Sequence, residues 1–406
     1  MGAFGPTVAG LSIHFEQVIE SIPRAIVERI LEETGRQSTR IRKLPAYLMV
    51  YYEIALGLMV SASAREVLRH LLADVRDQFL DASVEIASRT AICNARQRLG
   101  VEPIRKLFEL LVKPIAKRTT PSAWFRHLRL VALDGSSFHL QDSPGNRKRY
   151  GKASAARGKA SPLPLIRWVA LCEIGTHVVF AARMAAWKIG EVTLAKQLIS
   201  RLEPGMLCLA DRLFYGFPLW SQAVATGADL LWRVQKGIPL PCLKRLHDGS
   251  YLSEVRGRSN GPVADRRRSR PVRVIEFYVK VGRSRKYYRL ITTLLNPRTA
   301  PATELAELYA KRWGIETVLA EVKTYLKGPG TLRSQLPELV EQDFYGLLIA
   351  HFGVRSIMHE AAQQQRIPPT ELSFIHAVRV VIRRLPEMVS FSPLWWLPDA
   401  PSAAGG

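Results

Sequence analysis

Cysteine is scarce in this chain of 406 residues, and its spacing excludes the usual cysteine chemistry. No two of the four cysteines form a CxxC or CxxH pair, so neither a zinc finger nor a redox motif is expected. Isolated cysteines in a chain of this length are typical of reduced, mostly buried small hydrophobic residues. They are Cys93, Cys172, Cys208 and Cys242.

Long hydrophobic runs are also missing. The most apolar run, residues 46–60, is shorter than the roughly 20 residues that cross a membrane, and it contains Glu53. It therefore predicts a buried helix and no membrane partner. The N-terminus lacks the basic start and apolar core of a secretory signal. We expect a cytoplasmic protein in a compartment that contains DNA.

Acidic residues are few compared with basic ones. The chain has 58 Lys and Arg against 35 Asp and Glu, a formal net charge of +23, and 47% hydrophobic residues. That apolar content excludes a disordered polybasic tail. The charge favours a polyanionic partner, most simply nucleic acid, although an arginine-rich proteome would also give a basic protein. Residues 235–300 contain 16 Lys and Arg against four Asp and Glu, so about half of the net charge lies there.

Hydrophobic periodicity divides the chain into four regions. Residues from about 12 to 120 are predicted to be helical. Within them the segment 88–99 is amphipathic and ends at Gly100, with Arg89, Arg96 and Arg98 on its polar face. That face suits either a helix that lies on DNA or an ordinary solvated surface.

The pattern changes near His127 to a mixed α/β core. Short apolar runs at residues 128–134, 206–211 and 228–234 predict strands, two β-rich runs separated at Gly175 predict a hairpin, and helical segments lie between them. Residues 235–297 alternate like strands and form the basic segment. Helices are predicted to follow at residues 302–326, 337–363 and 369–385.

Two acids stand at the ends of predicted strands. Asp134 ends the run LVALD, and Asp211 ends the run MLCLAD. A sheet holds acids at such positions rigidly while the following loops leave them accessible, which suits catalysis. An Asp at a strand end can equally be a helix cap or a turn former.

A third acid is predicted on the helix that begins at Ala302. At about 100° per residue, four side chains of this helix project within a wedge of about 60° around its axis: Tyr309, Arg312, Glu316 and Lys323. A solvated face with charge pairs is the simplest interpretation of such a helix. The order Arg then Glu is the less favourable one for a helix pair, and a Tyr with two bases around one acid suits a phosphate beside a metal ion.

These residues carry a resemblance to a known family. The segment 309–323 fits the Tyr-x2-Arg-x3-Glu-x6-Lys signature of transposases of the insertion sequence 4 family. The segment 134–151, with Asp142 and Asn146, is similar to that family's first-Asp segment, and LADRLFYGFPLW is similar to its second. Leu213 departs from the pattern, because some members have an acid there.

The resemblance implies an α/β, RNase H-like catalytic core with a β-rich insertion, preceded by an all-helical N-terminal domain and followed by C-terminal helices. The implied domains run in chain order from a helical, DNA-binding N-terminal domain through the two parts of the core, with the basic insertion between them, to a flexible tail. Their ranges are 1–122, 123–234, 235–300, 301–390 and 391–406.

It also implies that Asp134, Asp211 and Glu316 are catalytic and bind two divalent cations. Three carboxylates without a His or Cys cluster suit Mg²⁺, with Mn²⁺ as a substitute, rather than Zn²⁺. Two such ions can activate a water or a 3′-OH and stabilise the leaving oxygen of a phosphoryl transfer.

The remaining site residues are expected to contact DNA. Tyr309, Arg312 and Lys323 are predicted to hold phosphates. Arg212 is predicted either to contact DNA or to pair with Asp142. In relatives that cut through a hairpin, an aromatic residue holds a flipped base, and Tyr287 or Tyr288 stands in the corresponding strand; an ordinary tyrosine on a sheet is the alternative.

The function that follows is a cut-and-paste DNA transposase. It would bind terminal inverted repeats, cleave the element's ends and join them to target DNA, as a homodimer because two ends must be paired. Two alternatives remain: a metal-dependent DNA nuclease with an RNase H-like fold, and a DNA-binding protein derived from a transposase that has lost its chemistry. We expect association with the bacterial nucleoid.

Overall fold

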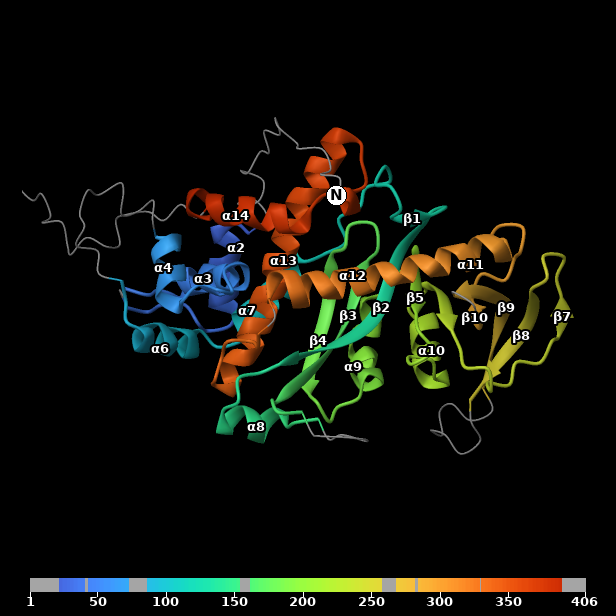
Figure 1. The fold of residues 1–406 in the computed structure, drawn as a ribbon, viewed down its shortest axis with the longest axis horizontal. Coiled ribbons are helices and arrows are strands. Elements are labelled where there is room, and N and C mark those ends of the chain that lie inside the picture. The colour runs from blue at the N-terminus through green and yellow to red at the C-terminus, as the bar shows by residue number, and fades with distance from the viewer. Residues whose placement is uncertain are drawn as a thin grey trace, which may run out of the picture. The chain divides into compact units, whose positions relative to one another are not determined.

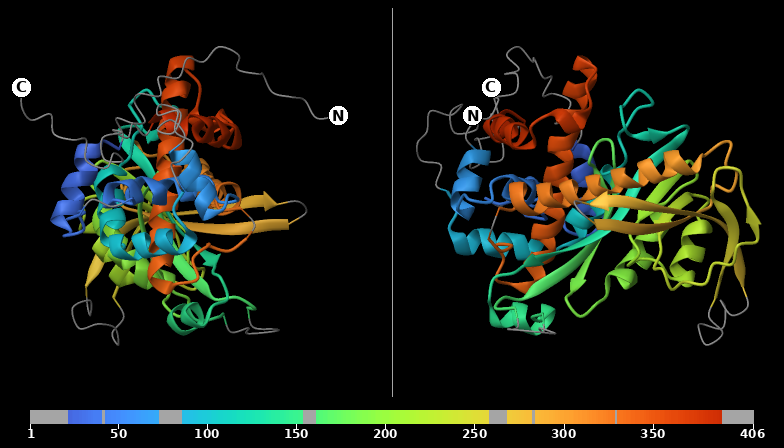
Figure 2. Two further views of the ribbon diagram at one scale, coloured as in Figure 1. Left: turned by 90° about the vertical axis from the view of Figure 1, so that its left-hand side faces the viewer. Right: turned by 45° about the vertical axis from the view of Figure 1, so that its right-hand side comes forward.

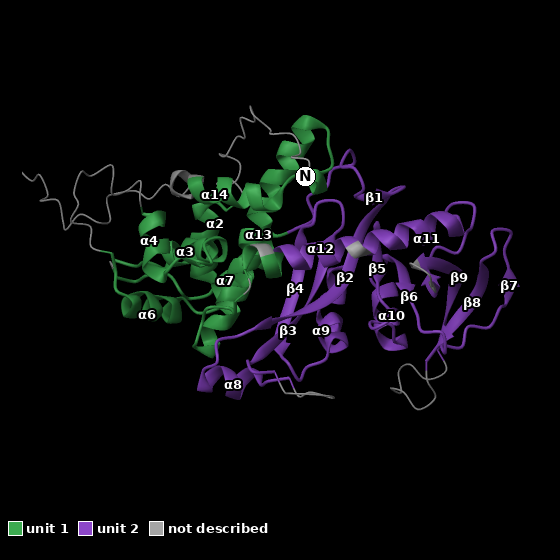
Figure 3. Ribbon diagram, viewed as in Figure 1, with its two compact units in different colours: residues 1–112, 322–406 green, residues 113–321 purple. Residues whose placement is uncertain are grey.

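The computed structural model of this chain describes residues 22–40, 43–72, 86–153, 161–257, 268–281, 284–328 and 330–388. The first turns of the helix predicted from residue 12, the arginines 266 and 267 and the predicted tail 391–406 lie outside these ranges. The chain divides into two compact units, residues 1–112 with 322–406 and residues 113–321, shown in different colours in Figure 3. The domain boundaries drawn from the sequence stay predictions.

The first unit is helical, as predicted for the N-terminal region and the C-terminal helices (Figure 1). Its longest helix, α13, packs against α3, the helix formed by the apolar run predicted to be buried. Ser63 and Ser88 cap α4 and α6 by accepting hydrogen bonds from the Glu66 and Ala91 amides, which gives the first turn the acceptor it lacks. The helices are α2 (Arg24–Glu33), α3 (Ala46–Leu58), α4 (Ala64–Leu71), α6 (Arg89–Leu99), α7 (Glu102–Leu111), α13 (Pro337–Gln365) and α14 (Phe374–Met388).

Among the residues that the structure describes, no helix is both long and apolar enough to cross a membrane. The cysteine prediction is confirmed only in part. Cys172 and Cys208 are buried and Cys93 is half-buried, but Cys242 is exposed, and all four are free thiols. Cys242 lies in the loop before a short edge strand, outside any packed face.

The second unit is built on one mixed sheet of ten strands. The strands are β1 (Trp124–Phe125), β2 (Leu128–His139), β3 (Leu165–Glu173), β4 (Val179–Ala186), β5 (Met206–Ala210), β6 (Asp229–Arg233), β7 (Lys244–Arg245), β8 (Tyr251–Arg256), β9 (Ser269–Val281) and β10 (Ser284–Thr292). The helices are α8 (Pro144–Tyr150), α9 (Glu191–Leu198), α10 (Phe217–Val224), α11 (Ala302–Ala310) and α12 (Gly314–Ala320).

The strand order is β4-β3-β2-β5-β6-β10-β9-β8-β7, with β1 beside β2. The first five strands in sequence after β1 lie in the spatial order third, second, first, fourth and fifth. The β2, β5 and β6 strands are parallel, and β3 runs antiparallel to both β2 and β4. This is the RNase H-like arrangement that the sequence predicted. The hairpin predicted around Gly175 is confirmed as β3 and β4.

The basic segment 235–300 is rich in strands, as expected, and it extends the core sheet. Its last strand, β10, pairs antiparallel with β6, and β9, β8 and β7 follow outward (Figure 2, right). The segment thus shares backbone hydrogen bonds with the strand next to β5. Backbone hydrogen bonds between paired strands hold the insertion to the core more firmly than a loop could.

Candidate active site

Asp134 and Asp211 are neighbours at one edge of the parallel part of the sheet. Leu133 and Ala210 form the last matched pair between β2 and β5, so the two aspartates are the next residues on adjacent strands. Asp134 has 21% of its side chain exposed and Asp211 has 29%. The sequence predicted an acid at the end of each apolar run, and the structure brings the two acids together at an edge where ligands reach α/β sheets.

The end of β2 was predicted wrongly. The strand does not stop at Asp134 but continues to His139, because β3 goes on pairing with it after β5 has ended, with Asp134 opposite Ala170. His139 is the last residue of the strand. Neighbouring side chains of a strand point to opposite faces, and a Cβ on Gly135 would lie 2.7 Å from the Glu191 carboxyl carbon of α9. Asp134 therefore faces away from α9.

The helix predicted from residue 302 to 326 is interrupted twice. It consists of α11, a 3₁₀ turn at Lys311–Trp313, α12 and a π-helical stretch at Glu321–Leu326. A π-helix bonds residue i to i+5, so the assumption of 100° per residue fails beyond Glu321. Such interruptions are frequent at functional sites.

Arg312, in the 3₁₀ turn, joins two of the three acids. Its guanidinium lies 3.2 Å from Asp134 Oδ2 and 3.5 Å from Glu316 Oε1. Arg312 is only 6% exposed, whereas the Glu316 side chain is 63% exposed. Arg312 thus connects Glu316, its predicted neighbour on the helix, to Asp134 on the sheet.

The three acids lie close enough for Asp211 and Glu316 to affect the pKa of Asp134. The pKa of Asp134 is raised, chiefly because the side chain is buried. The hydrogen bond from the Gly135 N–H and the charge of Arg312 favour the ionised form and lower the pKa in part. The charges of Asp211 and Glu316 raise the pKa of Asp134 further. Like charges so close together need a cation among them, and Arg312 supplies one in this structure.

Tyr309 is turned inward rather than toward solvent. It is 3% exposed, and its hydroxyl donates a hydrogen bond to the backbone carbonyl of Ala210, 3.3 Å away. Burial also raises the pKa of its phenol. This contact ties α11 to the last residue of β5, directly before Asp211, so Tyr309 positions the site in the structure. Its predicted phosphate contact stays a prediction.

Arg233 is a site residue that the sequence interpretation missed. It ends β6 beside Asp211, with the guanidinium 3.6 Å from Asp211 Oδ1. The same guanidinium covers the ring of Tyr288 at 4.2 Å, while Phe277 stacks on that ring at 5.5 Å. Tyr288, the predicted base-stacking residue, is 8% exposed. The position of Arg233 at the end of the third parallel strand was the signal that could have identified it.

The other predicted contacts are placed as follows. Arg212 is exposed directly after Asp211, while Asp142 pairs with Arg147 at 2.7 Å and Lys152 at 3.3 Å rather than with Arg212. Lys323 is half-buried in the π-helical stretch and belongs to the other unit. The phosphate-binding roles of both cations stay predictions.

A buried pair lies behind α12. His177 Nδ1 is 2.9 Å from Glu321 Oε1, and both residues are nearly inaccessible. Gly314, the first residue of α12, faces the same histidine, which is 3.9 Å from the position a Cβ would take. The pair links the turn between β3 and β4 to the end of the helix that carries Glu316. Neither residue stood out in the sequence, because the contact spans 144 positions.

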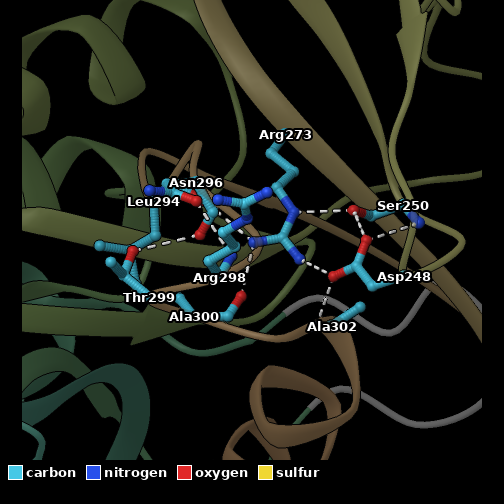
Figure 4. Close-up of polar contacts among 9 residues, drawn as sticks. All are labelled: Asp248, Ser250, Arg273, Leu294, Asn296, Arg298, Thr299, Ala300 and Ala302. Atoms are coloured by element: carbon cyan, nitrogen blue, oxygen red, sulfur yellow. Dashed lines mark hydrogen bonds and ion pairs between the residues drawn. The ribbon is translucent and has the colours of Figure 1, made fainter.

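The start of α11 is held by a buried arginine of the insertion, shown in Figure 4. Arg273 of β9 is completely buried and donates to the Ser250 hydroxyl at 2.7 Å and to the Ala300 carbonyl at 2.5 Å. It pairs with Asp248, which accepts a hydrogen bond from the Ala302 amide at 2.9 Å. Burial alone would raise the pKa of Asp248, but these hydrogen bonds and Arg273 outweigh it and lower that pKa. The insertion therefore anchors the first residue of the helix that leads to Arg312 and Glu316.

The donor set suits a hard divalent cation. Among the described ranges of the chain, no three His, Cys, Asp or Glu side chains converge as a metal site. Asp211 Oδ1, however, is buried without a hydrogen-bond partner among the described residues, and only the Arg233 ion pair at 3.6 Å faces it there. Carboxylate oxygens of this kind fit Mg²⁺ or Mn²⁺.

Known proteins resemble this chain over most of its length. The family described as "Transposase DDE domain" matches residues 126–352, more than half of the chain, and "Insertion element 4 transposase N-terminal" matches residues 12–109. The chain is 29% identical over 375 residues to "Transposase InsG for insertion sequence element IS4" of Escherichia coli (strain K12), covering 91% of this chain and 82% of that protein. It is 26% identical over 214 residues to transposase InsZ of the same organism, covering 52% and 69%.

Among solved structures, the chain resembles a piggyBac transposase synaptic complex with hairpin DNA at 11% identity and a TM-score of 0.43, over 91% of this chain and 77% of that one. That structural likeness is too distant to support the family assignment, which rests on the sequence matches. The two family matches follow one another along the sequence, and the second spans both aspartates and the glutamate. The chain belongs to the DDE transposases of the insertion sequence 4 family.

Proposed function

We propose that this transposase cuts an insertion sequence at its terminal inverted repeats and joins the ends to target DNA, with Asp134, Asp211 and Glu316 as the catalytic acids. The observation that carries the proposal is the meeting of Asp134 and Asp211 at the ends of parallel strands, with Arg312 linking Asp134 to Glu316. Acids on rigid strands keep the geometry that a phosphoryl transfer needs.

The three carboxylates would hold two divalent cations, Mg²⁺ or Mn²⁺. Such ions activate a water or a 3′-OH and stabilise the leaving oxygen, so no covalent enzyme intermediate is needed. Arg312 can hold the acids together and then present its guanidinium to a phosphate, since a planar fork suits both partners. Arg212, exposed beside Asp211, and Lys323 supply further positive charge for the DNA backbone.

The strongly basic insertion supports a DNA partner on the same unit. Its strands continue the sheet that carries the acids, so its charge lies on the unit that would cut. Binding that depends on such charge weakens steeply as salt is raised. The enzyme would act on double-stranded DNA as a homodimer, one protomer for each end, in association with the nucleoid.

The test is a cleavage and joining assay with a plasmid that carries the element's ends, purified protein and Mg²⁺. Wild type should give 3′-OH ends joined to target DNA. Asp134→Asn, Asp211→Asn and Glu316→Gln should each remove the chemistry and leave end binding intact, because they preserve side-chain volume. Random nicking by wild type would indicate the nuclease alternative. Binding without any cleavage would indicate an inactive DNA-binding descendant, and full activity of any one variant would refute the assignment of that acid.

A further inference from the structure

Helix α6 has a buried face and a polar face, and the division differs from the one drawn from the sequence. Ile92, Ala95, Arg96 and Leu99 are buried, so Arg96 does not belong to the polar face. The exposed residues of the helix are Arg89 and Thr90 in its first turn and Asn94, Gln97 and Arg98 further along. α6 contains no acidic residue. In Figure 1, α6 lies at the outer edge of its unit, below α3 and α4.

Arg96 fixes α6 in one orientation. Its guanidinium donates to Glu53 of α3 at 2.6 Å and 2.9 Å and to Asp343 of α13 at 2.7 Å. The Gln342 side chain also donates to the Arg96 carbonyl at 3.0 Å. Buried charges are tolerated when they are fully paired, and a network of this kind specifies one arrangement more than it adds stability. The helix therefore cannot rotate about its axis without breaking several buried bonds.

Part of the outward face has no polar partner among the residues that the structure describes. At about 100° per residue, Thr90, Asn94 and Arg98 lie within about 80° of one another over two turns. Their side chains form no hydrogen bond or ion pair with any residue that the structure describes. Gln97 differs, because its amide donates to Glu338 at 3.1 Å. Thr, Asn and Arg are the side-chain types that hydrogen-bond base edges in the major groove.

Surface arginines stand at both ends of α6. The Arg65 guanidinium donates to the Ile86 carbonyl, two residues before the Ser88 cap, at 3.4 Å. At the other end the Arg36 guanidinium donates to the Arg98 carbonyl at 3.1 Å. Both arginines are exposed. An 11-residue helix is about 16 Å long, so these cations are spaced to reach the phosphates on either side of a groove about 12 Å wide.

We propose that α6 is the helix that reads the element's terminal repeats, with Asn94 and Arg98 bound to base edges in the major groove. Thr90 supports them, and Arg36 and Arg65 bind the flanking phosphates. Asn pairs with adenine and Arg with guanine by two hydrogen bonds each, so the face is suited to a site that contains both bases. The assignment rests on the proposed function, because it requires that the protein recognise the ends of an element.

The test compares binding to two duplexes, one carrying the inverted repeat that flanks the gene and one with the same bases scrambled. Asn94→Ala and Arg98→Ala should each weaken binding to the repeat about 5- to 150-fold. Binding to the scrambled duplex should be unchanged for Asn94→Ala and only slightly weaker for Arg98→Ala. The control is Arg29→Ala on α2, an exposed arginine away from α6, which should change both affinities equally and little.

A panel of repeats with single base-pair changes sharpens the result. Wild type should discriminate at several positions, and Asn94→Ala should lose discrimination at one of them. The inference is overturned when wild type prefers the repeat and both variants keep that preference, or when the variants lose affinity for both duplexes alike. A wild-type protein that shows no preference for the repeat would instead count against the proposed function. All variants should keep the wild-type melting temperature, because the changed side chains are exposed.

Discussion

Gly346 of α13 lies where two helices of the first unit come closest. A Cβ built on it would lie 2.6 Å from the Glu53 carbonyl oxygen and 3.1 Å from the Glu53 carbonyl carbon of α3. Both are backbone atoms of a helix, so no side-chain rotation can relieve the overlap. Gly346→Ala should therefore push α3 and α13 apart and lower the free energy of unfolding by about 1–3 kcal/mol, the usual cost of overpacking.

The same helix provides a matched control. A Cβ on Gly353 would meet no atom of the described residues within 4 Å. At an unobstructed helix position alanine is favoured over glycine by about 0.5–1 kcal/mol, because it loses less conformational entropy on folding. The same substitution seven residues apart should thus have opposite signs. For a unit of this size, each 1 kcal/mol moves the melting temperature by about 2–4 °C.

The assay is thermal unfolding of the full chain, followed by binding to the flanking repeat. Gly346→Ala should melt several degrees below wild type, and Gly353→Ala at or above it. Since Glu53 also holds Arg96 of α6, Gly346→Ala should weaken repeat binding and Gly353→Ala should not. Equal melting temperatures for Gly346→Ala and Gly353→Ala would refute the close approach of α3 and α13.

Three further outcomes follow. Tyr309→Phe removes the hydrogen bond to the Ala210 carbonyl, which should lower the free energy of unfolding by about 0.5–1.5 kcal/mol. DNA cleavage should slow while repeat binding stays constant. A loss of binding would show that the hydroxyl contacts DNA. Asp248 has a lowered pKa, so its contribution to stability is present at neutral pH and is lost as the pH falls below about 4. Asp248→Asn should be less stable than wild type at pH 7, with a difference that shrinks in acid; a constant difference would contradict the shift. Chelation with EDTA should stop cleavage and spare binding, and added Mg²⁺ or Mn²⁺ should restore it.

Local patterns predicted most of the elements because the elements are regular. The alternation of strands and helices after His127 predicted β2 to β6 in their order along the chain. The apolar run at residues 46–60 predicted α3. Predictions failed where neighbours in space decide the outcome. The extension of β2 to His139 depends on β3, and the interruptions of the helix after Ala302 depend on the residues packed around Arg312 and Glu321.

The sequence by itself indicated the family. The signature at residues 309–323 and the two aspartate segments sufficed for that, because each is a pattern within a short stretch of the chain. Only the tertiary structure decided which arginines pair with the three acids and which pair with other residues. It placed Arg312 between Asp134 and Glu316 and Arg233 beside Asp211, and it turned Arg96 inward to a buried pair. Such choices depend on burial and on partners that are distant in the sequence, which no spacing along the chain specifies.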